Sequence, residues 1–377
     1  MKTTLRPMAI LVVTLCCFFG QQPAGRGTEK VEDVVLNRKT PSAAARIHGF
    51  RLEKIFEIDT ENPVVRDVGI PDIFGFDVDS KGRIIVLREY KGDGPFLFLF
   101  DERGRFIKSF GRQGQGPGEL QNPNDVAFDK KDNILICDFG TGLSRYDKEG
   151  VFLGKAPAEK IIKFAAGPGS GLLGQFTGMG SEGDKIIFST SVQRLGPDFR
   201  PIAHLDELRV DMKPSDFRPI EPLLCWAVSR DRIFVLNEQR GYEIRVYDGK
   251  AKLVRVIRKE FDPVPISEAE RQKILKPFSP QMKEAFRFPG SHTPFQSVAA
   301  SDEGRLLVAT FEPGNGPGEF LFDLFDENGH FAAKKSLSAR ISWEGTLWIR
   351  MKGDKFYSLR EKDDGFKTVE ACRMTWE

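Results

Sequence analysis

The chain has 377 residues, of which 40% are hydrophobic, 29% charged and 11% aromatic. This composition can bury a core and excludes a disordered chain. Lys and Arg total 56 against 54 Asp and Glu, for a net charge of +2, which argues against a nucleic-acid partner because such binding needs a concentrated basic face. The 37 Gly, 23 Pro and 32 Phe favour strands joined by many turns.

Residues 1–25 have the order of a secretory signal. Lys2 and Arg6 precede an apolar run at residues 8–20, and a polar stretch follows. The run is shorter than the roughly 20 residues that a bilayer-spanning helix needs. We therefore expect an exported protein, in the periplasm, at the cell surface or outside the cell, without a transmembrane segment in the mature chain.

The five cysteines fall into two groups. Cys16 and Cys17 lie late in the apolar run and leave a lipid anchor open, although the residue before each is not the small residue of a bacterial lipobox. The mature chain keeps Cys137, Cys225 and Cys372 at wide spacings without a CxxC pair. This pattern fits neither a disulfide framework nor a zinc site, so we expect buried single thiols.

Three stretches of the sequence share a pattern of strand, polar turn and strand. They are residues 77–87 (DVDSKGRIIVL), 127–137 (AFDKKDNILIC) and 299–309 (AASDEGRLLVA), with weaker copies at residues 179–189, 227–237 and 342–352. Polar turn residues between runs of Val, Ile, Leu and Phe predict β-hairpins.

The six copies recur at a nearly regular interval. Their first turns fall at Gly82, Asp132, Gly183, Asp231, Gly304 and Gly345. Most copies are followed by a second hairpin, so each unit has four strands. Four strands every roughly 40 to 50 residues is the period of a propeller blade. We therefore predict an all-β fold: a six-bladed β-propeller of four-stranded antiparallel blades.

The remaining segments complete this architecture. Residues 49–59 form a lone predicted strand before the first blade, which we expect to join the last blade and close the ring. A longer interval between two copies contains an insertion near residues 263–292, which predicts short helices capped by Ser267. The predicted divisions are a signal at residues 1–25, a linker at 26–44 and the propeller at 45–377.

Residues 110–138, FGRQGQGPGELQNPNDVAFDKKDNILICD, resemble an NHL repeat, with a glycine-rich link, a proline and a strand that ends in Asp. Residues 312–320, EPGNGPGEF, repeat the glycine motif within a blade. The mature chain is therefore similar to bacterial secreted six-bladed propellers related to NHL-repeat proteins. The resemblance implies the fold and leaves the function open, because propellers serve as enzymes, receptors and scaffolds.

Propellers usually bind ligands at the mouth of the central tunnel, where the loops that enter the first strand and leave the second strand of each blade meet. Repeat equivalence predicts ten polar residues there, namely Asp72, Arg88, Asn124, Asp125, Asp138, Asn237, Glu238, Arg240, Gln296 and Thr310. A mouth of mixed charge suits a small polar ligand or a peptide better than a lipid.

A metal-dependent alternative uses some of the same residues. Resemblance to the calcium-dependent lactonases on six-bladed propellers would recruit Asn124, Asp125, Asp138 and Glu238, because Ca²⁺ prefers oxygen ligands. Asp and Asn at strand ends also cap turns, and this is the interpretation we favour. The four His residues occupy non-equivalent positions, so we do not expect a zinc site, and the sequence has no nucleophile elbow.

The sequence thus favours a monomeric, exported, non-enzymatic binding module for a partner protein, a peptide or a small polar ligand at the loop face. The alternative is a Ca²⁺-type hydrolase or lactonase with its site in the tunnel. The insertion near residues 263–292 is a further candidate contact element, because long excursions from a compact fold are often functional.

Overall fold

The computed structural model describes residues 33–62, 65, 70, 72–89, 94–157, 161–169, 171–213, 218, 222–316, 318–341, 346–362 and 365–377. The predicted signal at residues 1–25, with Cys16 and Cys17, lies outside them. Strands dominate the described part, with helices at α2 (Glu268–Leu275), α3 (Pro280–Ala285) and the 3-10 turn η1 (Glu238–Arg240). Within the described ranges, the helices are too short and too polar to span a bilayer.

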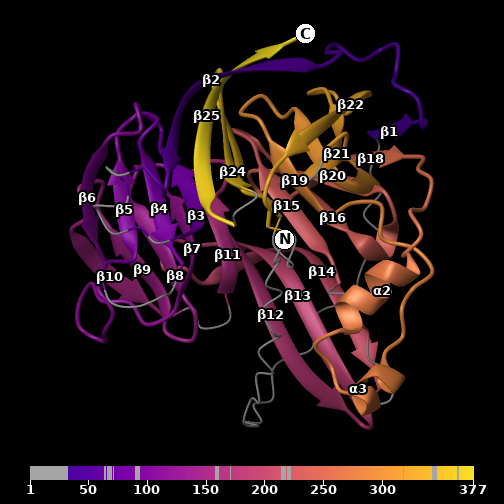
Figure 1. The fold of residues 1–377 in the computed structure, drawn as a ribbon, viewed down its shortest axis with the longest axis horizontal. Helices are drawn as coiled ribbons and strands as arrows, with labels where there is room; N and C mark the ends of the chain where they lie inside the picture. The colour runs from indigo at the N-terminus through magenta and orange to yellow at the C-terminus, as the bar shows by residue number, and fades with distance from the viewer. Residues whose placement is uncertain are drawn as a thin grey trace.

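Six sheets follow one another around a ring, which confirms the predicted six-bladed propeller (Figure 1). In blade 1 the strands are β3 (Ile73–Val78), β4 (Ile84–Arg88), β5 (Leu97–Phe100) and β6 (Phe106–Phe110). In blade 2 they are β7 (Pro123–Phe128), β8 (Ile134–Asp138), β9 (Gly142–Tyr146) and β10 (Phe152–Ala156). In blade 3 they are β11 (Ile161–Ala166), β12 (Leu172–Glu182), β13 (Lys185–Leu195) and β14 (Pro201–Met212).

The other half of the ring repeats this antiparallel pattern. Blade 4 contains β15 (Leu224–Val228), β16 (Arg232–Asn237), β17 (Glu243–Asp248) and β18 (Leu253–Lys259). Blade 5 contains β19 (Ser297–Ala300), β20 (Leu306–Pro313), β21 (Glu319–Phe325) and β22 (Phe331–Ser338). Blade 6 contains β23 (Ile349–Lys352), β24 (Lys355–Glu361), β25 (Lys367–Trp376) and, as its outermost strand, β2 (Phe50–Asp59).

Pairing between the two ends of the chain closes the ring, as the sequence predicts. Strand β2 runs antiparallel to β25, with Phe50 opposite Trp376 and Asp59 opposite Thr368. Figure 1 shows the two strands, indigo and yellow, side by side. This arrangement hides one edge of each strand.

Part of the segment predicted as a linker is a strand instead. Strand β1 (Val34–Asn37) adds to the outer edge of blade 4, parallel to β18. The buried Asn37 side chain holds it there, because its Nδ2 donates to the Gly329 carbonyl (2.9 Å) and its Oδ1 accepts from the Phe331 amide (2.7 Å). The unpaired groups of the β18 edge explain the pairing, since an exposed edge is a template for another strand.

The sequence repeats predict the wrong first turn in blade 3, and the turn that they predict in blade 6 lies outside the described residues. Gly183 lies between the second and third strands of blade 3, and the first turn of that blade lies between β11 and β12. Gly345 lies outside the described residues; the first turn of blade 6 joins β23 to β24 at Gly353, which has a φ of 58°. The true turn of blade 3 lies in a segment of Gly and Pro without the Asp and Lys residues of the strong copies, whereas the true turn of blade 6, at residues 352–355, is polar and lies one hairpin beyond the predicted one.

The core is divided among the gaps between blades. Among the described residues, buried apolar side chains form six clusters, and each cluster joins two adjacent blades. Cys137, Cys225 and Cys372 are buried within three of them as free thiols, as predicted. Each blade is therefore stabilised mainly by its neighbours, and ring closure completes the last interface.

Six hairpin turns share one hydrogen-bonding motif. In each, an Asp side chain accepts from the amides two and four residues later, and the residue three positions later has a positive φ. The Asp residues are Asp79, Asp101, Asp129, Asp147, Asp248 and Asp326. The left-handed position holds Gly in four turns, Asp132 in a fifth and Ala251 (φ 64°) in the sixth. An alanine in this region is strained, because its Cβ crowds the backbone.

We predict that Ala251→Gly stabilises the protein. Removing Cβ relieves the left-handed strain, so the free energy of unfolding should rise by about 0.5–1 kcal/mol. Ala156→Gly, in strand β10, is the matched control and should lower it, because glycine loses more conformational entropy in a strand. Denaturant unfolding of both variants measures the change; a loss of stability in Ala251→Gly would contradict the interpretation.

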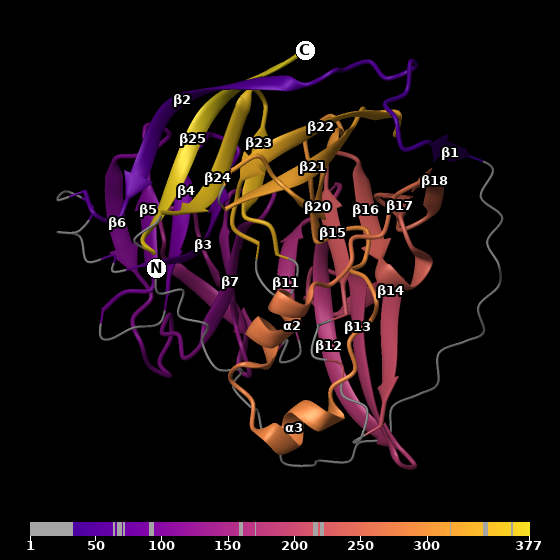
Figure 2. The same ribbon diagram turned by 45° about the vertical axis from the view of Figure 1, so that its right-hand side comes forward.

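The two ends of the ring differ. We call the end with the turns between first and second strands the turn face, and the opposite end, with the blade-to-blade connections, the link face. The long hairpin of β12 and β13 and the helical insertion of α2 and α3 both project from the link face (Figure 2). The His292 ring stacks on Phe311 of blade 5, with ring centroids 4.0 Å apart, and its Nε2 lies 3.1 Å from Glu270 Oε1 in α2. These contacts tie the insertion to blade 5.

Candidate functional site

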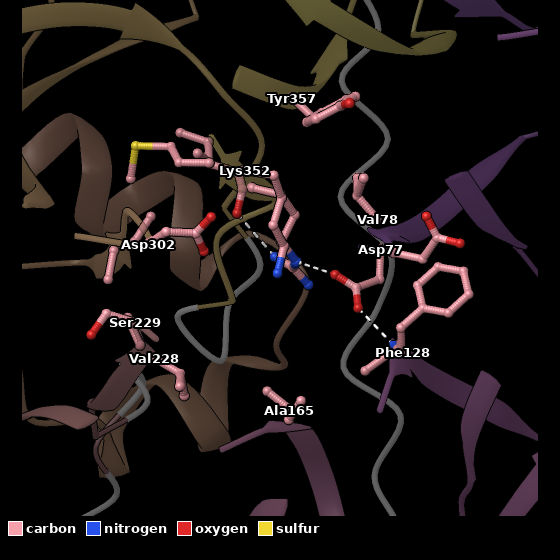
Figure 3. A pocket seen from close by; sticks show the side chains of 18 of the residues that line it. Asp77, Val78, Phe128, Ala165, Val228, Ser229, Asp302, Lys352 and Tyr357 are labelled. Carbon is pink, nitrogen blue, oxygen red and sulfur yellow. Dashed lines mark hydrogen bonds and ion pairs between the residues drawn. The ribbon is translucent and has the colours of Figure 1, made fainter. Parts of the chain in front are cut away.

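A cavity of about 580 Å³ occupies the tunnel and opens at the turn face. Residues of all six blades line it, and Figure 3 shows them around the opening. One labelled member from each blade, in blade order, is Val78, Phe128, Ala165, Val228, Asp302 and Lys352. The end of each first strand and the turn after it therefore form the wall.

Two carboxylates of the wall bind the free edge of the next blade's first strand. Asp77 Oδ2 accepts from the Phe128 amide at 2.8 Å, and Asp125 Oδ2 accepts from the Phe164 amide at 2.9 Å. First strands are edge strands, and their buried amides need a partner. These side chains supply it, and they thereby place negative charge in the tunnel.

Arg350 brings a compensating positive charge from blade 6. Its Nε donates to Asp77 Oδ1 at 2.6 Å, and its Nη1 donates to the Ile349 carbonyl at 3.0 Å (Figure 3). The guanidinium also lies over the rings of Phe76 and Trp348, 5.8 and 5.9 Å from their centroids. The side chain keeps 25% of its surface exposed, so this held cation remains accessible from the cavity.

Lys163 and Trp226 form the opposite part of the wall. The Lys163 ammonium lies 4.8 Å from the centroid of the indole ring, within cation–π range. The indole Nε1 donates to Gln175 Oε1 at 2.9 Å, and Gln175 Nε2 donates to Thr190 Oγ1 at 3.2 Å. These buried hydrogen bonds fix the ring, so the site is largely pre-formed.

Asp125 titrates near neutral pH. Burial raises the pKa of its carboxyl to about 7, although the Phe164 amide and the charges of Arg350 and Lys163 oppose the rise. The group is 5% exposed. The charge of the cavity therefore changes around pH 7.

The rim of the cavity carries charges of both signs, and its cations come from several blades. Lys81 of blade 1, Lys130 of blade 2, Arg230 of blade 4 and Lys352 of blade 6 all line it. Burial lowers the pKa of Lys130, and the charges of Lys352 and Arg230 lower it further, whereas Asp302 raises it. Side chains from three different blades are thus close enough to repel one another.

Of the ten residues predicted as tunnel-mouth candidates, Asp125 lines this cavity. Several others serve as caps or ion-pair partners at the ends of their own strands. Asp138 accepts from the amides of Gln121 and Asn122 and from Lys155 Nζ (3.0 Å). The oxygens of Asp138 are therefore occupied by the fold.

Three candidates gather around the blade 3 and blade 4 boundary. Asn237 and Arg240 both bind the buried carboxylate of Asp206. Glu238 accepts two hydrogen bonds from Arg218, at 2.6 and 3.1 Å. This group lies beside η1, and its hydrogen bonds link the two blades.

The remaining candidates lie at separate places. The Asp72 carboxylate accepts from Lys367 Nζ at 2.7 Å, and burial raises its pKa. The Arg88 Nη2 group donates to the Gly94 carbonyl. The other three make inter-strand or inter-blade contacts: Asn124 donates to the Ile162 carbonyl, Gln296 to the Thr310 carbonyl and Thr310 to the Leu321 carbonyl.

The structure does not bring the four calcium candidates together. Asn124, Asp125, Asp138 and Glu238 each bond to different partners, and within the described ranges no three His, Cys, Asp or Glu side chains gather as metal ligands. These residues do not fit a shared Ca²⁺ site.

Sequence reasoning missed Asp77, Lys163, Arg350 and the rim cations. A signal for the rim exists: the first turns of three copies carry a basic residue, at Lys81, Lys130 and Arg230. Arg350 and Lys163 lie in the two blades whose alignment was displaced or incomplete, so repeat equivalence could not find them.

Comparisons with known proteins agree with this architecture. Residues 78–167 match a family model described as 6-bladed beta-propeller. The chain is a six-bladed β-propeller. The match spans about a quarter of the chain, from the end of β3 to the end of β11, and the other blades of the ring repeat the same four-stranded pattern. A search of curated proteins finds no match.

Solved structures share the fold at low sequence identity. An exported-protein candidate from Bacteroides fragilis aligns with a TM-score of 0.51 and 11% identity over 91% of this propeller and 99% of that chain. A member of the DUF4221 family from Bacteroides vulgatus gives 0.50 and 10%, over 88% and 100%. Regucalcin, a calcium-binding protein from Agrobacterium tumefaciens, gives 0.42 and 11%, over 91% and 97%.

We predict that Asp125→Asn changes how stability depends on pH. The folded pKa of about 7 exceeds the unfolded value of about 4, so the carboxyl's contribution is complete below about pH 4 and is lost as pH rises through 7. Asn keeps a side-chain oxygen for the Phe164 amide and carries no charge. The variant should therefore gain about 2–3 kcal/mol over the parent between pH 5 and pH 8.

Denaturant unfolding of parent and variant at both pH values measures this gain. Asp77→Asn is the contrasting control, because it breaks the ion pair with Arg350 and should lower stability. A pH-independent difference between Asp125→Asn and the parent would contradict the assignment.

Proposed function

We propose that this propeller is an exported binding module that holds a small polar ligand in its tunnel, at the turn face. The observation that carries the proposal is the cavity of about 580 Å³, a size within the range of small-molecule sites. Its wall combines a rigid indole, two fixed cations and a carboxylate that titrates near pH 7, which is the mixture of apolar surface and convergent polar groups typical of ligand pockets.

Access favours the turn face. Short turns surround the opening there, whereas the long β12–β13 hairpin and the α2–α3 insertion project from the link face (Figures 1 and 2). The link-face candidates are engaged in hydrogen bonds and ion pairs of the fold. The proposal therefore moves the ligand to the other end of the tunnel from the loop face that the sequence favoured.

Export is supported by the signal-like order of residues 1–25 and by the description of the Bacteroides fragilis neighbour as an exported protein candidate. An exported propeller meets its ligand outside the cytoplasm.

Filling the tunnel should abolish ligand binding. Ala165 lines the cavity in blade 3 (Figure 3), so Ala165→Trp places an indole in the ligand volume. Val228→Phe obstructs the same space from blade 4, which guards against a folding defect in one variant. Val151→Trp is the control, because Val151 is 57% exposed on the outer hairpin of blade 2.

Calorimetric titration of sucrose, triglycine, citrate and fructose 1,6-bisphosphate into parent and variants measures the effect. We expect at least one probe to bind the parent and the Val151→Trp variant, and both tunnel variants to lose about tenfold or more in affinity. Absence of binding by all four probes, or full binding to both folded tunnel variants, would refute the proposal.

A further inference from the structure

We propose that the tunnel ligand is an oxyanion, a small molecule with two or more carboxylate or phosphate groups that the rim cations recognise. This inference rests on the proposed function and names its ligand class. It follows from which charged residues of the cavity form ion pairs with described residues and which do not.

The rim cations form no ion pairs within the described part of the chain. Lys81, Lys130, Arg230, Lys352 and Lys355 line the cavity, and none of them forms an ion pair with another described residue. They come from blades 1, 2, 4 and 6, so the ring fold itself gathers them at one opening.

The carboxylates of the same wall are engaged. Asp77 pairs with Arg350 and Asp79 with Arg83, both at 2.6 Å. Asp132 accepts from the Ser80 amide and hydroxyl at 2.9 and 2.6 Å. The oxygens of these carboxylates are thus occupied by donors of the fold, whereas the rim ammonium and guanidinium groups form no ion pair within the described residues.

Asp302 does not neutralise the rim. Its Oδ2 accepts from the Gly353 amide at 3.1 Å, and it forms no ion pair within the described structure. Burial lowers the pKa of Lys130, and repulsion by the charges of Lys352 and Arg230 lowers it further, although Asp302 raises it. An anion bound among Lys130, Arg230 and Lys352 would relieve that repulsion, which a neutral ligand cannot do.

Arg350 provides a further anion-binding group in the wall of the tunnel. Arg350 uses Nε and Nη1 within the fold, while its Nη2 has no hydrogen-bond partner among the described residues. A guanidinium edge suits a carboxylate or phosphate oxygen. One acidic group can contact the rim while a second reaches Arg350, which favours a ligand with two or more charges.

The test compares each anion with an uncharged analogue on the purified protein. Citrate is titrated against triethyl citrate, and fructose 1,6-bisphosphate against fructose. We expect at least one anion to bind about tenfold or more tightly than its analogue, and its affinity to fall as NaCl rises from about 50 to about 500 mM. Binding by citrate alone identifies carboxylates, and binding by the bisphosphate alone identifies phosphates.

The residue test uses one combined variant with Lys130→Gln, Arg230→Gln and Lys352→Gln. These side chains are exposed, so the melting temperature should not change, while anion affinity should fall about tenfold or more. Lys131→Gln is the matched control: it removes the adjacent charge in the same turn, outside the cavity lining, and should bind as the parent does.

Equal binding of anions and neutral analogues, or undiminished anion binding by the combined variant, would overturn the inference. If sucrose or triglycine binds and the tunnel variants abolish that binding while neither anion binds, the proposed function stands and the anion inference fails. If anion binding needs the rim cations and persists in both tunnel variants, the anion site stands and the tunnel proposal fails.

Discussion

The free edge of each blade's first strand is the constraint on which this molecule depends. A propeller leaves that edge facing the tunnel, and its buried amides and carbonyls must find partners without another strand. Here side chains of the preceding blade provide them, most clearly where Asp77 and Asp125 bind the Phe128 and Phe164 amides. Carboxylates placed in a tunnel require cations nearby, and Arg350 supplies one. The charges of the proposed ligand site thus arise because the free strand edges need hydrogen-bond partners.

The turns show the same dual use of residues. The Asp motif fixes the backbone of each turn through two amides, as Asp79 and Asp129 do in blades 1 and 2. Lys81 and Lys130 lie within these turns, and both line the cavity. The backbone of a rigid turn is already ordered, so a bound ligand has to order only the lysine side chain. Because the blades repeat around the ring, several such turns meet at the same opening of the tunnel.

Much of the fold could be predicted from the sequence because its signals are local. Hairpin turns such as those at Gly82 and Gly304 combine a left-handed position with flanking apolar runs, so the blade count and the closing strand could be inferred. Blade 3 failed because its long second hairpin, around Gly183, resembles a first turn more closely than the true one. Strand β1 escaped prediction because four residues gain stability only from an edge that the sequence does not display.

The site could not be predicted in the same way, because function depends on which charges remain without partners. Asp72 precedes the first strand of blade 1 and Lys130 follows the first strand of blade 2, but repeat position does not show whether either charge has a partner. Lys367, nearly 300 residues from Asp72 in the chain, neutralises the first, whereas no described carboxylate pairs with the second. Partnership of this kind is set by the closure of the ring, which brings blade 6 against blade 1. The assembled ring therefore decides which end of the tunnel is structural and which can bind.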